Sequence, residues 1–433
     1  MFIDILRRLK LRYAASGSSS YHILTIMTGT TIAQAIPIAI SPILTRLYSP
    51  SDFGVFALFS AIVSIAAIMS TGRYELAIVL PEKDKDAINL LALSVFISFG
   101  VGLSVWLLVA VFHSELVLLL GNPGISTWLY WVPISVLLTG LYQALNYWSS
   151  RKKRFDRLAV SRITQSTSGA SANLYFGYCG LGVSGLIVGN LVGQSCATIA
   201  LIWQVWRDEK SLTQLISKKS MKRNASEYRA FPLVNSFHAF LDAVQSSGII
   251  FIIAAFFGST ILGFYSFTLR VLKTPLGLVG SSVSQVFFQK AAETYNEGGD
   301  LHHLLRKTMI RLAIIAFPMF VIIGLFSPDI FEFFFGKPWR EAGEFAQILT
   351  PWIFLNFIVS PIAGVYLIVG KQKQAIFFAL GDVLTKVGSV VLGAYFLNAK
   401  LAFYLMSIAG VLTLIIGIIW TFKITSKKRV VCA

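Results

Sequence analysis

The stretch RDEKSLTQLISKKSMKRNASEYRAFP, residues 207–232, is the longest basic connection between two apolar runs, and it carries seven lysines and arginines. Most other basic residues also lie in short connections, on alternate sides of the apolar runs. When the N-terminus is counted as inside, 27 basic residues lie on that side of the predicted membrane, and three lie on the other: Lys337, Arg340 and Lys400. This asymmetry follows the positive-inside rule. It predicts a multi-pass protein of a cytoplasmic (inner) membrane with both termini in the cytoplasm.

The composition agrees with a membrane location. Of 433 residues, 55% are hydrophobic and 13% are charged, which is too apolar for an ordinary soluble protein. The formal net charge of +17 could suggest nucleic acid. Because the positive charges lie in short loops beside the predicted membrane, they indicate contact with the anionic headgroups of membrane lipids, and we expect no nucleic-acid partner.

The apolar runs are long enough for membrane-spanning helices, each of which needs about 20 residues. The sequence predicts an all-α membrane protein with twelve spans, at residues 22–46, 53–79, 88–112, 127–149, 158–178, 183–206, 233–257, 261–290, 303–326, 345–369, 374–397 and 401–423. The basic connection divides them into two groups of six. We therefore expect an N-terminal lobe (1–206), a cytoplasmic linker (207–232) and a C-terminal lobe with a basic cytoplasmic tail (233–433).

The two predicted lobes share a short sequence pattern. DFGVFALF (52–59) opens the second span and ILGFYSF (261–267) opens the eighth, and both contain a glycine followed closely by aromatic residues. Each follows a very short outward turn. Since each lobe has an even number of spans, such a repeat would be related by a pseudo-two-fold axis along the membrane normal.

Charged residues inside spans are costly and normally face a cavity or a partner. Arg270 and Lys273 lie about three turns into the eighth predicted span, and their i, i+3 spacing places both on one helix face. No acid in the same span is near enough to neutralise them. They indicate a water-filled cavity that receives an anion, and the alternative is an ion pair across the bundle with Asp242 or another acid.

Other charges in the spans allow two interpretations each. Arg73 and Glu75 are two residues apart, so in a helix they would point to different faces and would not pair well with each other; either could close a cytoplasmic gate by pairing with another helix, or serve a structural ion pair. Asp382 and Lys386 have the i, i+4 spacing of a mutual salt bridge, although a coupling or gating role is open. Arg46 lies at the outward end of the first span, where it could reach the headgroups.

The seventh predicted span holds one acid, Asp242, which is the best candidate for a protonatable group that couples transport to protons. Apart from Lys290, Arg306, Lys307 and Lys423, which lie at the inner ends of spans and are counted above with the inside residues, the predicted spans contain seven cations and three acids, so their interior is cationic.

The sequence offers little for catalysis. It contains no phosphate-binding P-loop, no nucleophile elbow and no suitably paired carboxylates, and the pair His302-His303 has no nearby third ligand for a metal. The longest outward loop, about residues 327–344, is too small for the catalytic residues of a glycan polymerase or ligase. We therefore expect a protein that is not an enzyme and has no metal or cofactor.

TRLYSPSDFG (45–54) and GRYELAIVLP (72–81) resemble the first two spans of the Wzx-type O-antigen and capsule flippases of the multidrug/oligosaccharidyl-lipid/polysaccharide (MOP) exporter superfamily. The predicted layout of twelve spans in two lobes is similar as well. The resemblance implies two six-helix bundles around a central cavity. It also implies transport of undecaprenyl-diphosphate-linked oligosaccharide across the bacterial inner membrane by alternating access. The polysaccharide polymerase machinery is an implied partner.

The resemblance implies a cationic cavity, for which Arg270, Lys273 and Arg73 are the matching positions and Arg46 a further candidate. Candidate polar residues facing the cavity are Gln34, Asn235 and Gln245. The alternative function is a cation-coupled multidrug exporter of the same superfamily. Cationic drugs would favour an acidic cavity, whereas the predicted spans carry an excess of positive charge.

Overall fold

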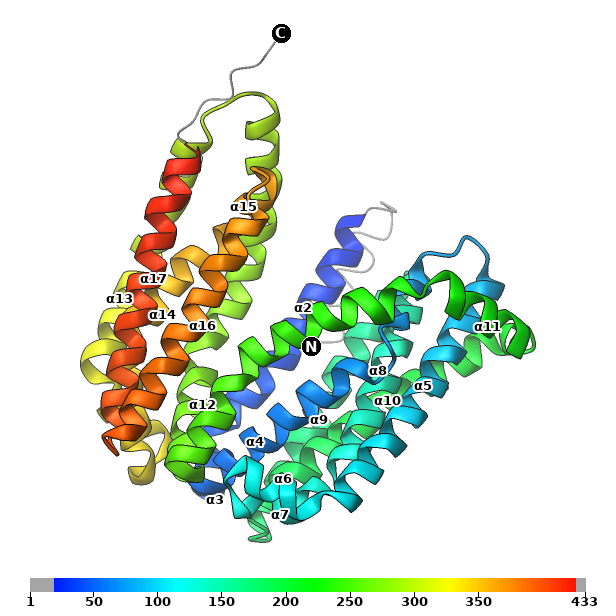
Figure 1. Cartoon of the computed structure of the whole chain (residues 1–433), viewed down its shortest axis with the longest axis horizontal. Helices are drawn as coiled ribbons and strands as arrows, with labels where there is room; N and C mark the ends of the chain where they lie inside the picture. The colour runs from blue at the N-terminus through cyan, green and yellow to red at the C-terminus, as the bar shows by residue number, and fades with distance from the viewer. Residues whose placement is uncertain (1–18, 426–433) are drawn as a thin grey trace, which may run out of the picture. The chain divides into compact units, whose positions relative to one another are not determined.

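The computed structural model describes residues 19–425, and every regular element in that range is helical (Figure 1). The elements are α2 (Ser19–Ala39), α3 (Ser41–Leu47), α4 (Pro50–Ala66), η1 (Ala67–Met69), η2 (Tyr74–Val79), α5 (Asp84–Val111), α6 (His113–Leu120), η3 (Pro123–Ile125), α7 (Ser126–Leu129), α8 (Val132–Arg151), α9 (Phe155–Tyr178), α10 (Val183–Thr213), α11 (Lys218–Glu227), η4 (Phe231–Asn235), α12 (Ser236–Asn296), α13 (Leu301–Phe335), η5 (Lys337–Trp339), α14 (Arg340–Val359), η6 (Ser360–Ile362), α15 (Val365–Ile368), α16 (Gln372–Tyr395) and α17 (Ala399–Thr425). The basic residues of both tails, in 1–18 and 426–433, lie outside the described residues.

The multi-span prediction is confirmed. Within residues 19–425, eight helices are long and apolar enough to cross a membrane. Pro123–Leu129 and Val132–Arg151, bent by 56° relative to each other, would together add a ninth. The number of twelve spans stays a prediction.

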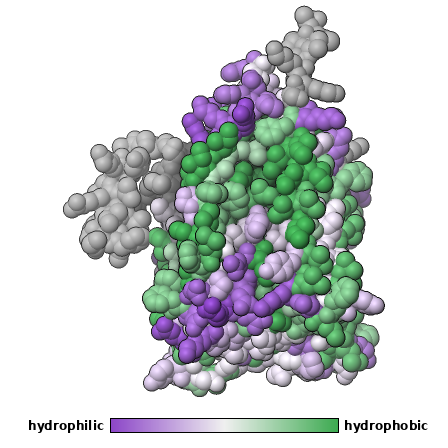
Figure 2. Space-filling view, turned by 90° about the vertical axis from the view of Figure 1, so that its left-hand side faces the viewer, coloured by the Kyte–Doolittle hydropathy of each residue, from purple (hydrophilic) through white to green (hydrophobic). Residues whose placement is uncertain are grey.

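Hydrophobic side chains cover the outside of several helices. Figure 2 shows a face on which they gather in a broad area between hydrophilic side chains at the upper and lower ends. On α13, the exposed side chains include Ile314, Phe317 and Leu325. Such surfaces are stable in contact with lipid and would be unstable in water.

The described chain divides into two compact units. Unit 1 comprises Met1–Tyr48 and Leu58–Gly248, and unit 2 comprises Ser49–Ala57 and Ile249–Ala433. The long element α12 contains a break at Gly258, which has φ 77° and ψ −178°. A break there agrees with the short turn predicted at 258–260, because only glycine adopts this backbone conformation readily.

In unit 1, α10 packs along α9, and α2 packs on the same helix. Gly193 of α10 allows the close approach, because a Cβ there would lie 2.7 Å from the carbonyl oxygen of Gln165 and 3.0 Å from the Cα of Gly169. Small residues at a helix contact are the usual means of close packing in membranes.

A buried ion-pair network closes one end of the α9–α10 pair. Arg157 is only 3% exposed, and its guanidinium contacts the carboxylates of Asp208 at 2.8 Å and Glu209 at 3.1 Å. The indole N–H of the buried Trp148 also donates to Glu209. α10 is distorted at Glu209, with φ −136°. Because a buried arginine is costly without acceptors, the two acids at the end of α10 stabilise it.

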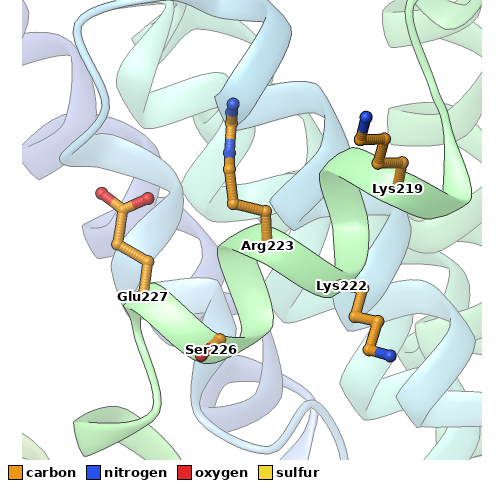
Figure 3. A pocket seen from close by; sticks show the side chains of 5 residues that line it. All are labelled: Lys219, Lys222, Arg223, Ser226 and Glu227. Carbon is orange, nitrogen blue, oxygen red and sulfur yellow. The ribbon is translucent and has the colours of Figure 1, made fainter.

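The predicted linker is partly a helix that packs on unit 1. α11 contacts α5. The amide of the buried Asn224 donates to the carbonyl of Asp86 at 2.9 Å, and the hydroxyl of Tyr74 donates to the carbonyl of Ala225 at 2.9 Å. Figure 3 shows other side chains of α11, including Lys219 and Lys222, around a hollow of about 550 Å³.

Unit 2 has an aromatic core around Phe267 of α12. The buried ring of Phe267 lies 4.5 Å from Trp339, 4.8 Å from Phe335 and 5.5 Å from Phe53, measured between ring centroids. Edge-to-face contacts of this kind stabilise by about 0.5–1.5 kcal/mol per pair beyond the burial of area. This core joins the part of α12 after Gly258, the end of α13, the N-cap of α14 and the start of α4.

The two segments that share the predicted repeat pattern contact each other reciprocally. A Cβ on Gly54 would overlap the carbonyl oxygen of Ser259, and a Cβ on Gly263 would overlap that of Pro50. Ser259 lies four positions before Gly263, and Pro50 lies four positions before Gly54. The contact is therefore symmetric, as expected where equivalent segments of a repeat meet.

Replacing Gly54 or Gly263 with alanine is expected to destabilise the protein by about 1–3 kcal/mol, because each methyl group would overlap backbone rather than a movable side chain. Thermal unfolding of the purified protein in detergent measures the effect. Gly417→Ala is the matched control, since nothing lies within 4 Å of its Cβ and α17 should tolerate it. An unfolding temperature of Gly54→Ala as high as that of the control would contradict the contact.

Candidate functional site

Arg270 and Lys273 lie on α12 after the Gly258 break, one turn apart and both exposed. Among residues 19–425, neither has a carboxylate within 4.0 Å in an ion pair, so the expected alternative of a direct partner is not observed there. Lys273 and Lys386 of α16 both lie over the ring of Trp352, so Lys273 is close to α16 within unit 2.

Two lysines share one tryptophan ring. The Nζ of Lys386 lies 4.2 Å from the ring centroid of Trp352 on α14, and the Nζ of Lys273 lies 5.5 Å from it. Trp352 is 5% exposed, and Gly410 of α17 lies against its ring, where a Cβ would overlap the indole. Cation–π contacts to a tryptophan stabilise an ammonium group without neutralising it.

One carboxylate, that of Asp382, pairs with one of these two lysines. Asp382 contacts the Nζ of Lys386 at 2.5 Å, which confirms the salt bridge predicted from the i, i+4 spacing. Its other oxygen accepts a hydrogen bond of 2.9 Å from the hydroxyl of Thr413 on α17. We call Lys273, Trp352, Asp382, Lys386 and Thr413 the Trp352 cluster, and we count with it Arg270, which lies one turn before Lys273 on α12.

The Trp352 cluster has an excess of positive charge. Its members include three cations and one carboxylate, and Lys386 already pairs with that carboxylate. Arg270 and Lys273 form no ion pair with a carboxylate among residues 19–425, and their binding of an anion stays a prediction. A guanidinium binds two phosphate oxygens with a fixed fork, and an ammonium adds a flexible point charge, so the pair fits a phosphate or diphosphate.

Sequence reasoning missed Trp352 and Thr413. Trp352 lies well inside α14, more than two turns from its first residue Arg340. That position was a usable signal, because a tryptophan far from both ends of a span does not belong to an interfacial belt. Thr413 gave no signal, since its role depends on the packing of α17 on α16.

The Arg73–Glu75 prediction was wrong in one respect. The two side chains do pair, with 3.5 Å between Nη1 of Arg73 and Oε1 of Glu75. The reason is that the expected helix ends at Met69: Arg73 has φ 61° and Glu75 lies in the short helix η2. The argument from opposite helix faces therefore does not apply.

Glu75 is deeply buried in unit 1. It is 1% exposed and accepts a hydrogen bond from the hydroxyl of Thr71. Burial raises the pKa of its carboxyl group, and the hydrogen bond and Arg73 act in the opposite direction. A carboxyl group so enclosed fits either a gate or a structural ion pair, and its role stays a prediction.

The remaining predicted site residues also belong to unit 1. Arg46 is exposed in the last turn of α3, and Gln34 is exposed on α2. Asn235 ends η4 and is half-buried, and Asp242 is exposed on the first part of α12. The side chain of Gln245 lies outside the described ones. The roles of these residues stay predictions.

Comparison with known proteins gives a family. A family described as polysaccharide biosynthesis protein matches residues 43–344, more than half of the chain. Amylovoran biosynthesis protein AmsL of Erwinia amylovora is 23% identical over 229 residues, which are 52% of this chain and 55% of that protein. Teichuronic acid biosynthesis protein TuaB of Bacillus subtilis (strain 168) is 23% identical over 261 residues, which are 58% of this chain and 51% of that protein. The chain spans about half the length of the curated relatives it matches.

Solved structures show the fold. A multidrug resistance MATE family transporter of the MOP superfamily, in an inward-facing conformation, matches with a TM-score of 0.72 and 14% identity over 94% of this chain and 96% of that one. The lipid II flippase MurJ, in an inward closed conformation, matches with a TM-score of 0.70 and 15% identity. The match covers 93% of this chain and 90% of that one. The chain therefore has the fold of these transporters, and it belongs to the polysaccharide biosynthesis protein family.

Proposed function

We propose that this protein is a flippase that translocates undecaprenyl-diphosphate-linked oligosaccharide repeat units across the bacterial inner membrane by alternating access, for O-antigen or capsule polysaccharide biosynthesis. Membership of the polysaccharide biosynthesis protein family and a fold shared with the lipid II flippase MurJ support a carrier for lipid-linked glycans. The observation that carries the proposal is the excess positive charge of the Trp352 cluster.

The physical barrier to this transport lies in the head of the substrate. A diphosphate and the sugar hydroxyls lose their hydration in the hydrocarbon core, at a cost far beyond thermal energy. Arg270 and Lys273 would replace water around the diphosphate, because neither is paired with a carboxylate in the described part of the chain. The polyprenyl tail needs no such replacement and can remain among the lipid chains.

The rest of the Trp352 cluster would set the strength of binding. Asp382 holds Lys386 beside Trp352, so the ammonium group adds positive potential to the site while keeping a fixed position. A carrier must also release its cargo. One carboxylate among three cations lowers the positive potential of the site without cancelling it, so the diphosphate can bind and can also dissociate.

The charge of the cluster also bears on the alternative, a cation-coupled multidrug exporter with the same fold. A cationic drug would need an acidic or aromatic site. In the Trp352 cluster, the aromatic face is already occupied by two ammonium groups and the one carboxylate is paired. The cluster therefore favours an anionic cargo.

Replacing both Arg270 and Lys273 with alanine should lower the export of surface polysaccharide by at least about tenfold, since each charge-assisted hydrogen bond is worth roughly 1.5–3 kcal/mol. Polysaccharide would be measured on cells that carry the variant as their only copy, together with the amount of protein in the membrane. The conservative exchange Arg270→Lys with Lys273→Arg should recover part of the export, because it keeps both charges.

The matched control is Lys337→Ala with Arg340→Ala. It also removes a lysine and an arginine three residues apart, but from an exposed turn where Arg340 pairs with Asp329 and Glu332. Export should be close to normal in this control. Normal polysaccharide from the Arg270/Lys273 variant at normal protein levels would rule out the proposed anion site.

Replacing Asp242 with asparagine should weaken the dependence of transport on an imposed proton gradient, if this exposed acid of α12 is the coupling group. Uptake of lipid-linked oligosaccharide into vesicles, measured over a range of imposed gradients, tests this. Asp329→Asn on the exposed end of α13 is the control and should keep the wild-type profile. A profile for Asp242→Asn identical to that of the wild type would remove this residue from the coupling scheme.

A further inference from the structure

A second concentration of positive charge lies on α12 and α13, well away from the Trp352 cluster. The last turns of α12 and the first turns of α13 border a cavity of about 750 Å³. Lys290, Lys307 and Arg311 line it. Lys290 follows Lys273 by 17 residues, which in an α-helix is a distance of about 25 Å, so the cavity is separate from the proposed substrate site.

The three cations of this cavity have no acidic partner among the described residues within 4.0 Å. One acid, Asp300, also lines the cavity, but its side chain accepts a hydrogen bond of 2.9 Å from the backbone N–H of His303 as the N-cap of α13. The carboxylate is thus held at the start of the helix. The lining keeps a net positive charge, which suits an anionic ligand.

The cavity is also amphipathic along the helices. On α12, Val283 and Val286 precede Lys290, and on α13, Ile315 follows Arg311, so on both helices the apolar residues lie further from the α12–α13 turn than the charges. From Lys290 to Val283 the helix rises about 10 Å, the distance from a headgroup to the upper part of an acyl chain. Val286 is 68% exposed and Ile315 is 69% exposed, so both are accessible to lipid.

We propose that this cavity binds the headgroup of an anionic phospholipid of the surrounding leaflet. The phosphate contacts Lys290, Lys307 and Arg311, and an acyl chain lies against Val286 and Ile315. The positive-inside pattern places this end of α12 and α13 at the cytoplasmic surface, where anionic headgroups attract basic pockets between helices. The bound lipid would stabilise the α12–α13 pair at its exposed end.

Native mass spectrometry of the purified protein, released from vesicles of equal parts phosphatidylglycerol and phosphatidylcholine, tests the proposal. The wild-type protein should retain phosphatidylglycerol in preference. The triple variant Lys290→Gln, Lys307→Gln, Arg311→Gln should lower that retention by about a hundredfold, as expected from three basic residues near an anionic surface. The triple variant Lys218→Gln, Lys219→Gln, Lys222→Gln on α11 removes the same charge on the same predicted side and should retain the lipid.

Unchanged retention of phosphatidylglycerol in the Lys290/Lys307/Arg311 variant would overturn the site. An equal loss of the lipid in the α11 control would also overturn it, because it would indicate general attraction to anionic lipid. Displacement of phosphatidylglycerol by an equimolar polyprenyl diphosphate would instead identify the cavity as a docking place for the substrate and also refute the phospholipid proposal.

A measurement on the wild-type protein tests the lipid site even if the Lys290/Lys307/Arg311 variant does not fold. Short-chain phosphatidylglycerol should raise the thermal unfolding temperature by several degrees more than short-chain phosphatidylcholine. An equal shift with both lipids would refute the site. The Arg270→Ala, Lys273→Ala variant should bind the lipid normally, so the outcomes for the lipid site and for the flippase are distinguishable.

Discussion

The structure depends on one electrostatic constraint: positive side chains held within apolar helices with too few carboxylates to neutralise them. In unit 2, Lys386 pairs with a single acid, Asp382, the ammonium groups of Lys273 and Lys386 contact the ring of Trp352, and Arg270 lies one turn from Lys273 on α12. Charges inside a membrane-spanning segment are costly unless an anion or water completes the site. In unit 1, by contrast, the buried Arg157 is neutralised by the two carboxylates that it contacts. The contrast separates a site open to a ligand from an ion pair that stabilises the fold.

The packing of unit 2 explains how such a charged group can be held in place. The rings around Phe267 pack the part of α12 after Gly258 against the N-cap of α14, and the reciprocal contact of Gly54 and Gly263 brings the backbone of α4 against α12 without side chains between them. Gly410 of α17 in turn lets the backbone of that helix lie directly against the ring of Trp352. Rigid aromatic and backbone contacts thus support both ends of the site, so the cations need not be positioned by acids of their own.

Much of the fold follows from sequence because it depends on local or one-dimensional signals. Hydropathy indicates the spans, the distribution of lysine and arginine predicts their orientation, and the i, i+4 spacing of Asp382 and Lys386 predicts their salt bridge. Features that depend on three-dimensional contacts were not predictable in this way. The pairing of Arg73 with Glu75 requires a left-handed residue just after a helix end, and the role of Trp352 requires lysines from two other helices. The acids at positions 208 and 209 were read as part of a linker, although they neutralise a buried arginine of α9.

The break in α12 has a consequence for how this chain can vary. At Gly258 a Cβ would meet no neighbouring atom within 4 Å, yet φ of 77° with ψ of −178° excludes any ordinary side chain. The restriction therefore comes from the handedness of the amino acids and not from crowding. A residue of mirror-image configuration would fit there, whereas the twenty encoded amino acids leave glycine as the one unstrained choice. The break between the two parts of α12 thus depends on a position that evolution cannot easily diversify, even though it faces open space.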